Sequence, residues 1–388
     1  MCAAHILVRT AHDLSGRRPC LLGMAHAHFY RYSKATFLEQ DVYMQSLISI
    51  LLFSFTLACL ALSFGLKAQT LDSAFDGFAQ IYQQELGTTQ GCEEPRLLEF
   101  KVCSSALKND GNAPYILHHG QPTAKVIVLF HGLSDSPFFL RSIAEAFHSE
   151  GHNVMVALLP GHGLLDADDD MQDPKLAKRW RQHIADISEL AASLGEVKYI
   201  GGFSTGGALA TEYVLQHPAE YKALLLFSGA LRLESTAETM ANIWGMRWVA
   251  KLMDGDYPTQ GRNPVKYPKV STYAAFQLVD VINSIRAKIK QKAPLNLPIF
   301  VAHSQADVTT LIQGVQDLMA YNQGQNTFFE IAKDDDVCHA DLVISDKQLQ
   351  DMDYDMENIG EHDKCSVPHA NPKHTAMLAA AISFLREN

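Results

Sequence analysis

Three kinds of signal are missing from this chain of 388 residues, and each absence argues against a class of function. The net charge is −11 and no lysine–arginine cluster is interleaved with aromatic residues, so nucleic-acid binding has no support. No cysteine–histidine spacing is typical of a zinc site. The acidic run over 351–357 lacks the glycine at position six and the acid at position twelve of a calcium loop. We therefore expect no metal, no cofactor and no nucleic-acid partner.

One long apolar run, residues 47–66, stands near the N-terminus. It has no charged residue and is long enough to cross a membrane. Met44 stands just before it and residues 1–43 show no periodicity, so we interpret 1–43 as a non-native or disordered extension. Residues 44–68 are then a cleaved signal peptide, an uncleaved membrane anchor or, because of Cys59, a lipoprotein signal. Each alternative predicts an exported protein that is periplasmic, secreted or membrane-anchored.

Cysteine usage agrees with export. Four of the seven cysteines follow residue 69: Cys92, Cys103, Cys338 and Cys365. An even number of cysteines after an export signal suggests disulfide bonds. Three pairings are possible, and we predict Cys92–Cys103 with Cys338–Cys365 because these bonds close the shortest loops.

A short motif in the middle of the chain points to a nucleophile. Gly202-Phe203-Ser204-Thr205-Gly206 stands between a strand candidate and an apolar helix candidate. A serine at a strand-to-helix turn needs glycine two positions before and after it, because side chains do not fit there. The helix N-terminus behind the serine offers free N–H groups to an oxyanion. We interpret Ser204 as the nucleophile; the alternative is a glycine-rich turn with a capping serine.

A second loop supplies the expected oxyanion hole. The apolar run over 126–130 is typical of a strand that is buried on both faces, and His131-Gly132-Leu133 follows it at once. Acyl transfer needs two N–H donors for the developing oxyanion. We assign them as the backbone N–H groups of Leu133 and Thr205, and we interpret the His131 side chain as structural.

Asp307 is the candidate for the triad carboxylate. It follows the apolar strand candidate 297–302, and a carboxylate just past a strand end can orient an imidazole. It also stands after Ser204, in the Ser…Asp…His order of this architecture. The alternative is an N-cap for a helix over 309–321.

The sequence leaves two candidates for the general base. His339 follows the strand candidate 327–331, where the base is expected to lie. His374 stands at the start of the terminal amphipathic helix candidate, over 372–386, and is the alternative.

Regular alternation of strands and helices organises residues 69–388 as one domain. After a helix over 71–86 and strands over 95–107 and 115–118, alternation implies a mostly parallel sheet that is covered on both faces. The strands are expected at 125–130, 153–158, 196–201 and 223–227, and the helices at 138–149, 175–194 and 206–216. The pattern breaks at about 231–294, which we interpret as a cap whose tryptophans and methionines either pack it or line an acyl pocket. A polar insertion occupies about 340–371.

These motifs together resemble the α/β-hydrolase superfamily, and most of all its esterase branch, which includes carboxylesterases and monoacylglycerol lipases. The resemblance rests on His131-Gly132, on the segment 159–163 (LPGHG) after the next strand and on the turn at Ser204. It extends from 126 to about 383 when Asp307 and the last helix are included. It implies the α/β-hydrolase fold, with a cap inserted between late strands. The insertion over 340–371 is longer than the family pattern.

The expected activity is hydrolysis of carboxylic esters through an acyl-enzyme. Ser204 would attack the acyl carbon, His339 would carry the proton and Asp307 would orient the imidazole. The resemblance implies a monoacylglycerol or a short-to-medium acyl ester, so the partner is a small-molecule ester or lipid, with possible membrane association through the N-terminal run. One alternative is a thioesterase or amidase on the same fold. The other is a non-catalytic binding protein on a hydrolase scaffold.

Overall fold

The computed structural model describes residues 71–92, 96–291, 294–357 and 364–388, which all belong to one compact unit. The predictions for residues 1–43 and 44–68 lie outside the described residues. Within the four described ranges, no helix combines the length and the apolar character that a membrane span requires.

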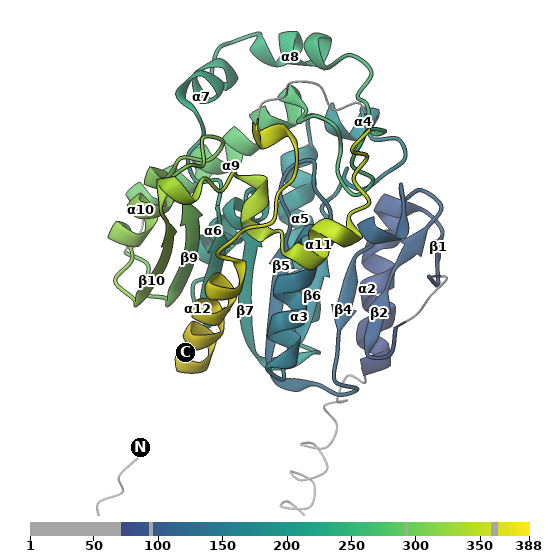
Figure 1. Ribbon diagram of the computed structural model, residues 1–388, viewed down its shortest axis with the longest axis vertical. Helices are drawn as coiled ribbons and strands as arrows, with labels where there is room; N and C mark the ends of the chain where they lie inside the picture. The colour runs from purple at the N-terminus through teal and green to yellow at the C-terminus, as the bar shows by residue number, and fades with distance from the viewer. Residues whose placement is uncertain (1–70, 93–95, 292–293, 358–363) are drawn as a thin grey trace, which may run out of the picture. The chain divides into compact units, whose positions relative to one another are not determined.

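An eight-stranded sheet lies at the centre of the described residues (Figure 1). Its strands, in spatial order, are β10 (Asn326–Ile331), β9 (Ile299–Ser304), β8 (Ala223–Phe227), β7 (Gly195–Phe203), β5 (Thr123–Phe130), β6 (Asn153–Ala157), β4 (Tyr115–Leu117) and β2 (Glu99–Lys101). The strands from β10 to β6 are parallel, whereas β4 and β2 run antiparallel to their neighbours. The carboxyl ends of parallel strands meet at one edge, so the loops after β5, β7, β9 and β10 come together there.

Alternation along β5 shows why the sheet is covered on both faces. Val126, Val128 and Phe130 point into one hydrophobic cluster, and Ile127 and Leu129 point into the other. All five side chains are fully buried, as expected for an unbroken apolar strand in a parallel sheet.

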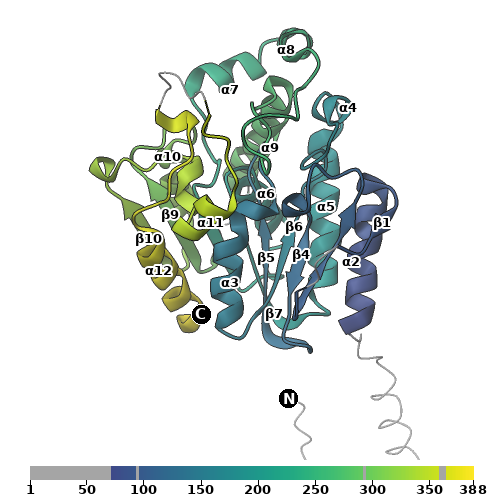
Figure 2. The same cartoon turned by 45° about the vertical axis from the view of Figure 1, so that its right-hand side comes forward.

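Helices build the two layers outside the sheet (Figures 1 and 2). The first cluster includes buried residues of α2 (Leu71–Leu86), α5 (Leu176–Ala191), α6 (Thr205–Gln216), α9 (Thr272–Gln291) and α10 (Ile312–Tyr321). The second includes buried residues of α3 (Arg141–Ser149) and α12 (His374–Glu387). The mixed, mostly parallel sheet and its two helical layers confirm the predicted architecture.

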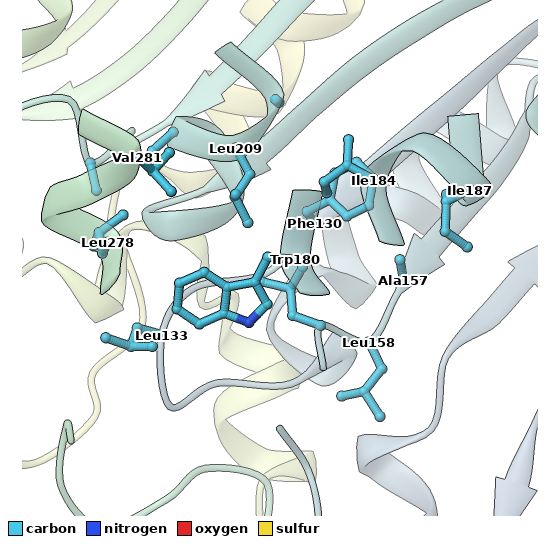
Figure 3. Close-up of a cluster of buried hydrophobic side chains, with 14 of the residues drawn as sticks. Phe130, Leu133, Ala157, Leu158, Trp180, Ile184, Ile187, Leu209, Leu278 and Val281 are labelled. Carbon is cyan, nitrogen blue, oxygen red and sulfur yellow. The ribbon is translucent and has the colours of Figure 1, made fainter. Parts of the chain in front are cut away.

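Trp180 of α5 lies in the first cluster (Figure 3). Its side chain is fully buried, and its indole N–H donates to the carbonyl oxygen of Pro160 at 3.0 Å. Phe130 of β5, Leu209 of α6 and Leu278 of α9 belong to the same cluster. The core therefore includes α9, from the segment in which the sequence predicts no regular element.

Two predicted elements differ in extent from those of the structure. The strand expected over 95–107 is divided into β2 and β3 (Cys103–Ser104), because β3 pairs instead with β1 (Thr89–Gln90) in a separate small sheet. The helix expected over 309–321 begins only at Ile312.

Residues 231–291 contain α9 and two shorter helices, α7 (Ser235–Ala241) and α8 (Met246–Asp254), here called the cap helices. The cap helices lie above the carboxyl edge of the sheet, at the top of Figures 1 and 2. Met240 and Met246 pack partly buried against the core. Trp244 and Trp248 were expected either to pack the cap or to line an acyl pocket. They do neither, since both are exposed and neither lines the cavity described below.

The region after β10 is built of short elements. They are three 3₁₀ turns, Lys333–Asp335, Ala340–Val343 and Lys364–Ser366, and the helix α11 (Asp346–Asp351). The structure contains both predicted disulfides, Cys92–Cys103 and Cys338–Cys365. The second bond ties the turn that carries His339 to a segment 27 residues further along the chain.

Candidate active site

Ser204 stands on a turn that only glycine neighbours permit. A Cβ atom on Gly202 would lie within 2.5 Å of the carbonyl oxygen of Phe130, and one on Gly206 would collide with the same atom. Ser204 itself has a φ of 51°, in a region that non-glycine residues rarely adopt. The turn is held by hydrogen bonds from the Ser204 and Gly206 N–H groups to Phe227 and His131, at 3.1 and 3.0 Å.

The structure brings Ser204, His339 and Asp307 into one chain of hydrogen bonds. The Nε2 atom of His339 lies 2.9 Å from the Ser204 hydroxyl oxygen, and its Nδ1 atom lies 2.6 Å from a carboxylate oxygen of Asp307. The His339 ring also stacks on Phe203, with ring centroids 4.9 Å apart. A proton on Nδ1 faces the carboxylate, which leaves the lone pair of Nε2 directed at the serine hydroxyl.

Asp307 is surrounded by donors that keep it ionised. Burial alone would raise the pKa of its carboxyl, but the charge and hydrogen bond of His339 and the backbone N–H of Thr310 lower it to about 2. The Thr310 N–H and hydroxyl donate to the two carboxylate oxygens at 3.0 and 2.9 Å, and the Thr309 N–H donates at 2.9 Å. Asp307 does not cap α10, as the alternative interpretation would require, because that helix begins at Ile312 and its N-cap residue is Leu311.

The structure places His374, the other candidate base, away from Ser204. The Nε2 atom of its ring lies 2.9 Å from the hydroxyl oxygen of Ser142 in α3. Its backbone N–H donates to the Asn371 carbonyl oxygen. Burial lowers the pKa of His374. His374 therefore joins α12 to α3.

Leu133 and Thr205, the predicted oxyanion donors, both border the same cavity as Ser204 and His339. Neither backbone N–H donates a hydrogen bond to another described residue. Thr205 is the first residue of α6, so its N–H group is one of those that a helix leaves unpaired. Both amides are thus available for a charged oxygen at the cavity wall.

His131 is structural, as the sequence predicts. Its Nδ1–H donates to the Gly132 carbonyl oxygen at 2.8 Å, and its Nε2 atom accepts from the Leu159 N–H at 3.0 Å. Complete burial and the nearby His162 hold the pKa of His131 well below its usual range. A neutral ring therefore joins the loop after β5 to the loop after β6.

Sequence reasoning missed an ion pair beside the loop that carries Leu133. The carboxylate of Asp135 is almost fully buried and pairs with the ammonium group of Lys266, 131 positions away. The backbone around Lys266 joins the same loop, because the Tyr267 N–H donates to the Ser134 carbonyl at 2.9 Å and the Ser136 hydroxyl donates to the Val265 carbonyl at 2.8 Å. We call residues 263–267 the strap.

Thr310 and His303 were also missed. The Nε2–H of His303 donates to the Thr310 carbonyl oxygen at 3.0 Å and lies 3.6 Å from the carboxylate of Asp307. His303 is completely buried and so braces the residue that holds Asp307. A polar residue two or three positions after an aspartate is the one sequence signal that could have indicated Thr310.

The cavity beside Ser204 has a volume of about 490 Å³. Its polar lining includes Ser204, Thr310 and His339, whereas its apolar walls come largely from the region of the cap helices and α9. The apolar lining includes Leu133, Leu233, Ala237, Val270, Ala275, Leu278 and Val308. An apolar chamber of this kind suits a hydrocarbon chain attached to a polar reacting group.

Among the described residues, one group of three potential metal ligands lies close together: Cys92, Cys103 and Asp110. The two sulfur atoms are bonded to each other, so they are not available to a metal.

Comparisons with known proteins show what this chain resembles. Residues 121–337, more than half of the chain, match the family described as serine aminopeptidase, S33; the match ends just before His339. A thermostable monoacylglycerol lipase from Bacillus sp. (strain H-257) is 23% identical over 166 residues, which are 42% of this chain and 64% of that relative. The aligned region thus spans less than two thirds of that lipase.

A solved structure from a study of LipS and LipT, two metagenome-derived lipolytic enzymes, superimposes with a TM-score of 0.51 at 16% identity. The superposition covers 69% of this chain and 96% of that chain. At this identity the likeness concerns the fold alone.

Proposed function

This chain belongs to the serine aminopeptidase, S33, family of α/β-hydrolases, and from that premise we propose that it is a serine hydrolase that cleaves carboxylic esters. The observation that carries the proposal is the hydrogen-bonded chain from Asp307 through His339 to Ser204, at 2.6 and 2.9 Å. A carboxylate that orients an imidazole, which in turn contacts a serine hydroxyl, activates that hydroxyl for attack on an acyl carbon.

In the proposed reaction the Ser204 oxygen attacks the acyl carbon while its proton passes to Nε2 of His339. Asp307 keeps the other ring proton on Nδ1 and stabilises the imidazolium that forms. The proton on Nε2 then goes to the departing alkoxide, which leaves as the alcohol. Water repeats the sequence on the acyl-enzyme: it loses a proton to His339, and the acid is released as Ser204 regains its hydrogen.

The N–H groups of Leu133 and Thr205 are proposed to hold the negative oxygen of each tetrahedral intermediate. Both are free among the described residues and border the cavity. A donor of this kind contributes roughly 3–4 kcal/mol to transition-state stabilisation.

An ester fits the cavity better than the amino-terminal peptide that the family description suggests. An aminopeptidase must bind the substrate's ammonium group with a free carboxylate. Of the described residues that line the cavity, Asp135 and Glu234 carry carboxylates. Asp135 is paired with Lys266, and Glu234 accepts the Thr236 N–H at 2.9 Å at the start of α7. The apolar walls instead favour an acyl chain, as in a monoacylglycerol or another short-to-medium acyl ester.

We assign residues 231–294 to a cap over this site and residues 340–371 to an insertion beside it. The two disulfides, Cys92–Cys103 and Cys338–Cys365, support the further proposal that the protein is exported, since such bonds persist in oxidising compartments.

Labelling with a fluorophosphonate probe tests the proposed function. The intact chain should be labelled at Ser204 and lose esterase activity in step with labelling, whereas Ser204→Ala should take up no probe. Competition by esters, thioesters and amides of the same acyl group then ranks the leaving groups, and esters should protect best. A chain that is folded but never labelled would be a non-catalytic scaffold.

A further inference from the structure

The tip of the cap carries an unusual set of exposed side chains. Five large apolar residues are more than half exposed there: Ile243, Trp244, Trp248, Leu252 and Met253. Trp244 is 98% exposed and Trp248 is 68% exposed, although tryptophan is a residue that folding normally buries. We call these five residues the tip patch.

The tip patch is held in place by the body of the molecule. The carboxylate of Asp254, the last residue of α8, is buried and accepts the N–H groups of Thr272 and Tyr273 at the start of α9, both at 2.9 Å. Ala250, one turn earlier on the same face of α8, is also buried. The helix α8 is thus attached to the body of the molecule through one face. Its other face, which carries Trp248 and Leu252, is exposed because of that attachment.

The two sides of α8 differ in the manner of a helix that lies in a lipid interface. Trp248 and Leu252 stand one turn apart on the exposed side, and the basic residues Arg247 and Lys251 stand one turn apart on the flank. Arg247 pairs with Asp280 at 2.6 Å, and Lys251 lies over the Tyr273 ring, so both cations stay beside α9. Tryptophan with basic residues along its flank is the composition that places such a helix at the headgroup level.

The tip patch also lies near the cavity beside Ser204. Ala237 of α7 lines the cavity, and Ile243 and Trp244 follow a few residues later, in the turn between the cap helices. Val270 and Val308 line the cavity as well and are themselves 49% and 73% exposed. Apolar surface is thus present both at the tip and at the rim of the chamber.

We propose that the tip patch inserts into a lipid surface, from which the acyl substrate passes to the cavity under the cap helices. The route for the substrate rests on the proposed function, but insertion does not. A second copy of the chain is a poorer occupant, because a stable interface takes about 20–30 residues a side and the patch offers five. The net charge of −11 favours a zwitterionic lipid over an anionic one.

The placement of the three tryptophans provides a direct test. Trp180 is fully buried in the core shown in Figure 3, whereas Trp244 and Trp248 belong to the tip patch. Phosphatidylcholine brominated along its acyl chains quenches a tryptophan only by close approach. The full chain carrying Ser204→Ala, which leaves the lipid intact, should lose the emission of Trp244 and Trp248 on mixing with vesicles of this lipid and keep that of Trp180.

One double variant and one control decide the outcome. Replacing both exposed tryptophans, as Trp244→Ser with Trp248→Ser, should weaken co-flotation with the vesicles, a readout that needs no tryptophan, whereas Leu97→Ser, a change at a residue 92% exposed and near β2, should leave co-flotation unchanged. Vesicle binding without quenching would overturn the proposal, since another part of the chain would then be the anchor. It would also be overturned if quenching were absent and the tryptophan variant converted a dimer into a monomer. Neither result depends on catalysis, so the proposed function is tested separately.

Discussion

The two turns that bring Ser204 and His339 together are held by different forces. The turn at Ser204 lies in the core, where the backbone of Phe130 leaves no space for a Cβ atom on Gly202 or Gly206. The turn at His339 lies near the surface, between the disulfide at Cys338 and the 3₁₀ turn that follows. Steric exclusion fixes the first turn, and a covalent cross-link with hydrogen bonds fixes the second.

The two turns should therefore tolerate different substitutions. The turn at Ser204 should respond to the smallest increase in side-chain size, because close-packed backbone cannot move aside. The turn at His339 should respond to the loss of its tethers, because a cross-link and hydrogen bonds, and not close-packed backbone, hold it. Four measurements, in order of decreasing expected effect, test this contrast.

Removal of the imidazole should have the largest effect. His339→Ala should lower kcat by on the order of 10⁴–10⁶, because the proton of Ser204 then has no acceptor. His374→Ala is the matched control and should stay within about tenfold of the parent, since its ring bonds to Ser142 and not to Ser204. Turnover of a p-nitrophenyl ester measures both, and the reverse ranking would make His374 the base.

A single added methyl group should disrupt the turn at Ser204. Gly206→Ala should destabilise the protein by about 3 kcal/mol or more, because the new Cβ would collide with the Phe130 carbonyl oxygen. Gly229→Ala is the control: its nearest neighbour would be Leu226 at 3.6 Å, an ordinary contact. Urea denaturation compares the two, and equal stability would show that the turn is not sterically fixed.

Loss of the disulfide should affect the histidine turn. Closing a loop of 27 residues contributes about 3.5 kcal/mol by loop-closure entropy, so Cys365→Ser should lose that stability and some turnover. Cys103→Ser opens the smaller loop of the other bond and should cost about 3 kcal/mol without a change in the turnover of the folded protein. If both variants kept full turnover, the bond would not position His339.

Acid should reveal how much the histidine turn stabilises Asp307. The folded-state pKa, about 2, lies below the usual 3.8, so this carboxyl contributes stability that is complete above about pH 4 and is lost as the pH falls through 2. The shift corresponds to about 2 kcal/mol. The stability difference between the parent and Asp307→Asn should therefore shrink over this range, and a constant difference would contradict the assigned contacts.

The same contrast explains how much could be predicted from the sequence. The turn at Ser204 is a local pattern, so its glycines and its position between β7 and α6 follow from neighbouring residues. The choice between His339 and His374 depends on how a long insertion folds back, and no local pattern determines that. The pair of Asp135 and Lys266 is formed by chain segments 131 positions apart, so no spacing rule could indicate it.

Elements were missed for similar reasons. The helix α9 was not predicted because the turn residues before it, among them Pro264 and Pro268, made the whole segment read as irregular. The strand expected over 95–107 was divided because pairing with β1, rather than local propensity, decides where Cys103 lies.

The strap limits how this protein could be re-engineered. Residues 263–267 lie within the segment that the sequence analysis assigns to the cap. They nevertheless form hydrogen bonds with the loop that carries the Leu133 N–H. A chimera that exchanged the entire segment between β8 and β9 for that of a relative would remove the partner of Asp135 and leave its carboxylate buried and unpaired. A transplant confined to residues 235–254 would keep that loop intact, so new substrate preferences could be introduced without rebuilding the catalytic machinery.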